Sequence, residues 1–216
     1  MALTSNLYPK VRLHAEGVPT PVMDRYIIDV VRFFCTESLT YRETLNDIAV
    51  LAGTAEYNMV ASAAAEEVVQ PLYAEFVDSD GSVHNLNPTT DEILRSAVES
   101  WRNRQGTPAL YFAPSVGRIR LFPEPDVAGT IHDLQVVKRP IVSTTTVPDY
   151  LYESWEMELA DGAAGRILMV PGKKWSNWTV GYRLWKMFVS DVRDVRRKVR
   201  AGLTGAPLQV VIPKIT

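Results

Sequence analysis

The sequence predicts an α+β fold, because helical periodicity is confined to the two ends of the chain and strand-like segments fill the middle. One amphipathic helix is expected over residues 21–37, and two long helices are expected over 148–170 and 177–201. Residues 39–140 instead contain short runs of β-branched and aromatic residues separated by turn signals. We therefore expect a bundle of three helices with a strand-rich insertion.

Length and composition favour a single domain with an extended segment at each end. The 216 residues are 46% hydrophobic and 22% charged, as in ordinary soluble proteins, and suffice for a sizeable core. No apolar run approaches the roughly 18 residues of a membrane span, and the N-terminus lacks the apolar stretch of a secretory signal. We expect cytoplasmic synthesis, no membrane contact, an arm at 1–20, a domain at 21–202 and a tail at 203–216.

The N-terminal part is expected to be an extended arm followed by a helix. Residues 1–20 contain Pro9, Gly17 and Pro19 without a clear apolar period. After Pro21, apolar residues recur at spacings of three and four, as in an amphipathic helix. Cys35 lies within that pattern and is expected to be a buried thiol. As the only cysteine, it excludes an intramolecular disulfide and a multi-thiolate zinc site.

Turn signals divide the middle of the chain into strands. The Asp-Gly pair within residues 78–82 predicts a turn between two strands. Thr89 and Glu92 have capping-box spacing and predict a short helix that ends before Gln105. The remaining elements are two strands joined by a turn at 114–117, a strand at 129–138 and an extended connector at 139–147.

The two C-terminal helices are expected to pack closely together. Pro148 suits a first helical position, and Asn177 offers a side-chain cap for the last helix. Small residues reduce the side-chain bulk of the first helix around its later turns: Ala160, Gly162, Ala163, Ala164 and Gly165. A helix broken near Asp161 is the alternative. The last helix has its own apolar period: Trp178, Tyr182, Trp185, Val189, Val192, Val195 and Val199.

No motif for catalysis or cofactor binding is present, so we expect neither an enzyme nor a cofactor. The sequence contains no Walker A loop, and no GxGxxG turn follows a strand. His14, His84 and His132 lack the spacing of a helical metal pair. The segment DSDG lacks the remaining ligands of a calcium loop, and no serine lies in a nucleophile elbow.

Two features indicate interaction surfaces. The last helix is basic, with a solvated face as the ordinary interpretation and a phosphate-binding stripe as the alternative. Its basic candidates are Arg193, Arg196, Arg197, Lys198 and Arg200. Aromatic residues flank the helical pair, either as core residues or at subunit contacts. They are Tyr150, Tyr152, Trp155, Trp175, Trp178, Tyr182 and Trp185.

The apolar tail is the third candidate surface. It is expected either to return to the molecule's own sheet or to add as a strand to a partner. Its apolar residues are Leu208, Val210, Val211, Ile212 and Ile215.

Four segments together resemble the head-to-tail adaptor, or connector, proteins of tailed bacteriophages. They are RFFCTES at the end of the first helix, LYFAPSVGRIRLFPEP, VPDYLYESWEMELADGAAGRILMVPGKKW and WKMFVSDVRDVRRKV. The resemblance covers roughly residues 20–202, and the stretch from Pro148 to Trp175 is its most distinctive part.

This resemblance implies a structural protein of the virion. It implies a ring, typically of twelve subunits, that binds the portal, contacts the tail tube or nozzle protein and passes the genome through its lumen without sequence-specific contact. The basic stretch Arg193–Arg200 is then expected to face either the portal or the lumen. Our hypothesis is that it meets an acidic portal surface, which charge reversal at Arg196 and Arg197 tests. The alternative is a small nucleic-acid-binding module that uses the basic last helix, and an enzyme of unknown type is a third reading.

Overall fold

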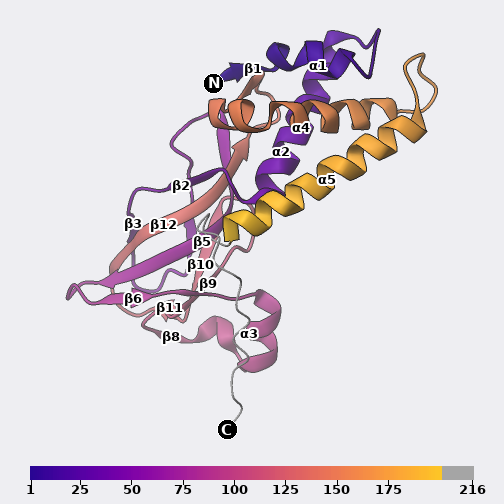
Figure 1. The fold of residues 1–216 in the computed structure, drawn as a ribbon. Helices are drawn as coiled ribbons and strands as arrows, with labels where there is room; N and C mark the ends of the chain where they lie inside the picture. The colour runs from indigo at the N-terminus through magenta and orange to yellow at the C-terminus, as the bar shows by residue number, and fades with distance from the viewer. Residues whose placement is uncertain (201–216) are drawn as a thin grey trace. The chain divides into compact units, whose positions relative to one another are not determined.

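The computed structural model describes residues 1–200, and these residues form a mixed α+β chain, as predicted (Figure 1). The chain divides into two compact units. The helical unit is built from both ends of the chain, Met1–Thr40 and the residues from Thr145 on. The strand unit is Tyr41–Thr144, whereas the strand-rich insertion was expected over 39–140.

The N-terminal segment is helical over much of its length, so the prediction of an extended arm is wrong there. After the short strand β1 (Ala2–Leu3) come a 3-10 turn, η1 (Thr4–Leu7), and a short helix, α1 (Tyr8–Arg12). Pro9 is tolerated because it lies in the first turn of α1. Buried apolar residues follow one another at steps of four, four and three, which the proline and glycine signals obscured. These residues are Leu7, Val11, Ala15 and Val18.

Three longer helices complete the helical unit: α2 (Thr20–Ser38), α4 (Asp149–Leu168) and α5 (Trp178–Arg200). The predicted helix after Pro21 is confirmed, and Cys35 is fully buried in it. The predicted cap of α5 is confirmed too, because Asn177 Oδ1 accepts a hydrogen bond from the Val180 N–H at 3.3 Å. Strand β13 (Thr146–Val147) pairs with β1 ahead of α4.

Helices α4 and α5 approach each other most closely at their glycines, as the small residues of α4 predicted. A Cβ added to Gly165 would lie 2.8 Å from the Trp185 backbone nitrogen, and one added to Gly162 would lie 2.8 Å from the Phe188 ring. The alternative of a break near Asp161 is not observed. Instead α4 is kinked at Trp155 (φ −139°, ψ 32°), six residues earlier.

Replacing Gly165 with alanine should therefore destabilise the helical unit, even though alanine is the better helix former. The propensity gain of about 1 kcal/mol is opposed by overpacking, which typically costs about 1–3 kcal/mol. We expect a lower midpoint of urea unfolding, because the two nearest atoms, the Trp185 nitrogen and the Gly181 carbonyl oxygen, are backbone and cannot rotate away. Ser190→Ala on the exposed side of α5 is the control. A Gly165→Ala protein that is more stable than the wild type would contradict the close approach.

The buried face of α5 differs from its expected apolar period. Trp178 and Tyr182, which begin that period, are 65% and 54% exposed. Only Val192 belongs both to the expected period and to the fully buried set, which is Gly181, Leu184, Phe188 and Val192. The buried face is rotated about the helix axis relative to the expected apolar face, because Gly181 packs against α4. A Cβ at this position would lie 2.8 Å from the Gly165 carbonyl oxygen, so no larger residue fits there.

The strand unit is centred on a long antiparallel pair, β5 (Glu66–Asp78) and β12 (Gly129–Pro140). The predicted turn after β5 is confirmed: Asp78 Oδ1 accepts hydrogen bonds from the N–H groups of Asp80 and Ser82, each at 3.0 Å. Other strands extend this sheet: β2 (Arg42–Thr44) and β3 (Ile48–Val50) pair with β12, and β6 (Val83–Asn85) pairs with β5.

A second sheet of the strand unit has the order β4-β10-β9-β7. Its strands are β4 (Glu56–Asn58), β10 (Arg118–Phe122), β9 (Leu110–Phe112) and β7 (Asn87–Pro88). Two short strands, β8 (Gln105–Gly106) and β11 (Glu124–Pro125), pair in parallel. The predicted short helix is α3 (Asp91–Ala97), followed by the 3-10 turn η2 (Trp101–Asn103). The N-terminal cap of α3 is Thr90 rather than Thr89, since Thr90 Oγ1 accepts a hydrogen bond from the Ile93 N–H at 3.2 Å.

Candidate interaction surfaces

Residues 1–200 contain no group of three or more histidine, cysteine or carboxylate side chains arranged to hold a metal ion. Each histidine instead contacts one carboxylate. His14 Nε2 lies 3.2 Å from Asp161, His84 Nε2 lies 3.3 Å from Asp78, and His132 Nδ1 lies 2.9 Å from Asp47. None of the helices in the described range is long and apolar enough to cross a lipid bilayer.

A cleft in the strand unit has a volume of about 380 Å³ and was not found from the sequence. The guanidinium groups of Arg102 and Arg120 lie 5.3 and 5.0 Å from the centre of the Trp101 ring. Arg120 also donates to Glu56 Oε1 at 2.8 Å. Because these residues come from segments 18 to 64 positions apart along the chain, no local motif marks the cleft. Its charged groups pair with one another and do not converge as a nucleophile and a base would.

The basic residues of α5 divide into paired and unpaired groups. Arg196 donates to Glu37 of α2 at 3.3 Å, and Arg197 pairs with Asp194 one turn earlier. Arg193, Lys198 and Arg200 form no ion pair within the part of the chain that is described. Charge reversal at Arg196 and Arg197 would therefore also break contacts within the helical unit. The tail candidates Leu208, Val210, Val211, Ile212 and Ile215 lie outside the described residues.

The aromatic residues around the helical pair also divide into two groups. Trp185 packs between α2 and α4: its ring centre lies 5.2 Å from that of Phe33, and the Arg166 guanidinium lies 5.1 Å away. Trp155 packs against Phe34, with ring centres 5.1 Å apart. Trp178 and Tyr182 are more than half exposed. Core packing therefore accounts for Trp155 and Trp185, whereas Trp178 and Tyr182 remain candidates for subunit contacts.

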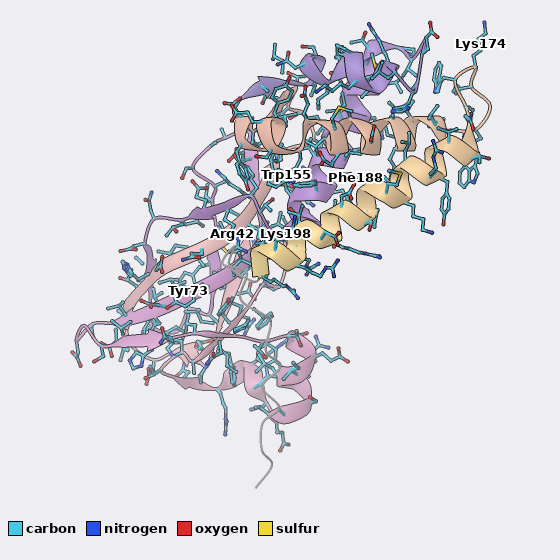
Figure 2. The ribbon with its side chains drawn as sticks, in the orientation of Figure 1. Arg42, Tyr73, Trp155, Lys174, Phe188 and Lys198 are labelled. Atoms are coloured by element: carbon cyan, nitrogen blue, oxygen red, sulfur yellow. The ribbon has the colours of Figure 1, made fainter. Side chains whose placement is uncertain are left out.

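The exposed aromatic residues lie next to the corner between α4 and α5. Figure 2 shows Lys174 extending from this corner, whereas Trp155 and Phe188 lie among the helices. Lys173 and Lys174 are both exposed there, and Trp178 begins the helix that follows. The corner between α4 and α5 therefore presents positive charge beside exposed aromatic side chains.

Comparison with known proteins assigns the chain to a family. A search among curated proteins found no match. The model of the SU10 adaptor protein family matches residues 5–204, and so includes both units and all of α5. This match agrees with the resemblance to phage head-to-tail adaptors that the sequence motifs indicated. The chain belongs to the SU10 adaptor protein family, a family of phage head-to-tail adaptors.

Proposed function

We propose that this protein is a structural component of a phage virion that assembles as a ring between the capsid portal and the tail. The genome passes through the lumen of the ring, and the protein has no catalytic role. The family match over residues 5–204 is the observation that carries this proposal. Its partners are the portal protein, the tail tube or nozzle protein and further copies of itself, with twelve as the expected number.

The surface of the helical unit supports an assembling protein. Aromatic side chains and arginine are enriched at protein interfaces, and α5 exposes Trp178 and Tyr182 together with several arginines. A closed ring requires each copy to present two different surfaces, one to each neighbour. The exposed rings of Trp178 and Tyr182 on α5 could form part of one of these two surfaces.

Imaging the full chain with and without its portal by negative-stain electron microscopy tests this function. We expect rings that share the portal's axis, either preformed or templated by the portal. Bovine serum albumin added at the same concentration is the control for nonspecific decoration. A chain that stays monomeric and leaves the portal unchanged at micromolar concentration would contradict the proposal.

The unpaired cations of α5 favour a second candidate function, nucleic-acid binding. If Arg193, Lys198 and Arg200 contact phosphates, binding of duplex DNA by the free protein should weaken steeply as salt is raised, because phosphate neutralisation releases counterions. An electrophoretic shift assay over a salt series measures this slope. Tight and salt-dependent DNA binding without ring formation would favour the second candidate over the adaptor function.

A further inference from the structure

One side of α5 carries positive charge and aromatic surface along its whole length. The residues recur at steps of four or seven, so they lie on one flank of the helix. We call this flank the basic–aromatic stripe, which consists of Trp178, Tyr182, Lys186, Arg193 and Arg200. All five are exposed, and the three cations form no ion pair with residues 1–200. Over 22 residues the stripe is roughly 33 Å long.

The opposite side of α5 carries a carboxylate, Asp191, that has no cation partner within residues 1–200. Asp191 lies two positions before Arg193, which places the two side chains about 160° apart around the helix. Met187 precedes Asp191 by one turn and is 54% exposed. Glu158 of α4 lies close enough to act on Asp191 electrostatically. We call Glu158, Met187 and Asp191 the acidic patch.

The electrostatics of Asp191 show that negative charge accumulates at the patch. Partial burial raises the pKa of Asp191, and the neighbouring carboxylates of Glu158, Asp194 and Asp161 raise it further. Asp194 is paired with Arg197, and Asp161 contacts His14. Glu158 and Asp191 have no cation partner in the described range. Two cations on this side of α5 have no ion pair within residues 1–200: Arg183, two turns before Asp191, and Lys198, two turns beyond it.

A single copy cannot join its own stripe to its own patch, because the buried face of α5 separates them. We propose that the basic–aromatic stripe of one copy docks on the acidic patch of the next copy. The proposal rests on the adaptor function above and identifies the surfaces through which the ring closes. Charge complementarity aligns Lys186 and Arg193 with Glu158 and Asp191. Trp178 and Tyr182 supply aromatic surface, which thioether side chains such as Met187 contact favourably.

This contact is heterologous, since each copy uses two different surfaces and leaves one of each free for the next neighbour. Repetition of such a contact closes a ring when the rotation between copies divides a full turn. The same logic predicts how charge-reversed copies combine, and this makes the proposal directly testable.

Two charge-reversal variants test the contact. The stripe variant carries Lys186→Glu and Arg193→Glu, and the patch variant carries Glu158→Lys and Asp191→Lys. None of the four residues forms an ion pair within residues 1–200, so folding should be preserved, and circular dichroism checks this. Assembly is measured by sedimentation velocity, with the portal present as a template. We expect each variant alone to lose at least about tenfold of the assembled fraction, because like charges then face each other.

An equimolar mixture of the two variants should assemble again. The patch variant keeps a normal stripe for the normal patch of the stripe variant, and their reversed surfaces also attract each other. The mixed ring alternates the two copies and has an even number of subunits, which native mass spectrometry measures. Rescue within about twofold of the wild type is expected. Variants that assemble alone, or a mixture that stays unassembled, would overturn the proposal.

The outcomes separate this inference from the proposed function. A wild-type chain that forms no ring with the portal would reject the adaptor function. A wild-type chain that forms rings while both variants also form them would reject only the stripe–patch contact. A stripe variant that forms normal rings yet fails to bind the portal or DNA would assign the stripe to that partner and would likewise overturn the inference.

Chemical cross-linking provides a second, independent readout. Arg193→Cys in the stripe and Met187→Cys in the patch are mixed and treated with a short bis-maleimide. We expect heterodimers, because the native Cys35 is fully buried and only the new thiols react. The control mixture places both thiols on the stripe, as Lys186→Cys and Arg193→Cys. Equal cross-linking in the two mixtures would contradict the contact.

Discussion

Replacing Phe188 with alanine should cost the helical unit about 3–5 kcal/mol of unfolding free energy, the usual range for a fully buried phenylalanine. Phe188 is 1% exposed and lies where three helices meet. Its ring centre lies 6.0 Å from Phe33, 6.3 Å from Phe34 and 5.3 Å from Trp185. The glycine beneath it, Gly162, has no side chain that can fill the resulting cavity.

Urea unfolding followed by tryptophan fluorescence measures this loss selectively. Four of the five tryptophans lie in the helical unit, and only Trp101 lies in the strand unit. The fluorescence transition therefore reports mainly on the helical unit. Ser190→Ala is the matched control in the same helix and should change stability by less than about 0.5 kcal/mol. A Phe188→Ala protein that unfolds at the wild-type urea concentration would show that Phe188 is not part of this core.

Replacing Lys138 with methionine should have an effect of similar size in the strand unit. Lys138 Nζ lies 2.6 Å from Glu66 Oε2 and 3.5 Å from Glu43 Oε2, and the Glu66 side chain is only 2% exposed. The Tyr41 hydroxyl also donates to Glu66. Without the lysine, a buried carboxylate loses its cation, which typically costs about 3–5 kcal/mol. Hydrogen exchange of β5 and β12 amides measures the loss within this unit.

A double variant distinguishes loss of the charge pair from loss of packing. Lys138→Met combined with Glu66→Gln should recover much of the stability, because the most deeply buried carboxylate is then neutral. Glu43, whose side chain is 17% exposed, keeps the hydrogen bond that the Ser62 N–H donates at 3.4 Å. Arg95→Met is the surface control. It breaks the exposed Arg95–Asp91 pair of α3, and such pairs contribute about 0–1 kcal/mol. A double variant as unstable as Lys138→Met would refute the charge explanation.

The candidate surfaces follow from the sequence only in part. The basic residues of α5 are visible as a run, but the run does not show that Arg196 and Arg197 are already paired with Glu37 and Asp194. Glu37 lies 159 residues before Arg196 along the chain, so no local pattern links the two residues. The two-residue spacing already places Arg193 and Asp191 on different sides of the helix, but only the structure shows that the buried face of α5 lies between those two sides.

Local signals determined the features that depend on neighbours within a few residues. Asn177 caps α5, the Asp-Gly turn follows β5, and the glycines of α4 admit close helix packing, because caps, turns and missing side chains act over one or two helical turns. The four quoted segments likewise indicated the family.

Tertiary contacts decided the rest. The N-terminal segment is helical because Leu7 and Val11 are fully buried, and α5 is rotated so that Gly181 rather than Trp178 faces α4. The pairing of Lys138 with Glu66 depends on the register of β5 against β12. Burial and register depend on residues far apart in the chain, and periodicity within one segment carries no information about the segment against which it packs.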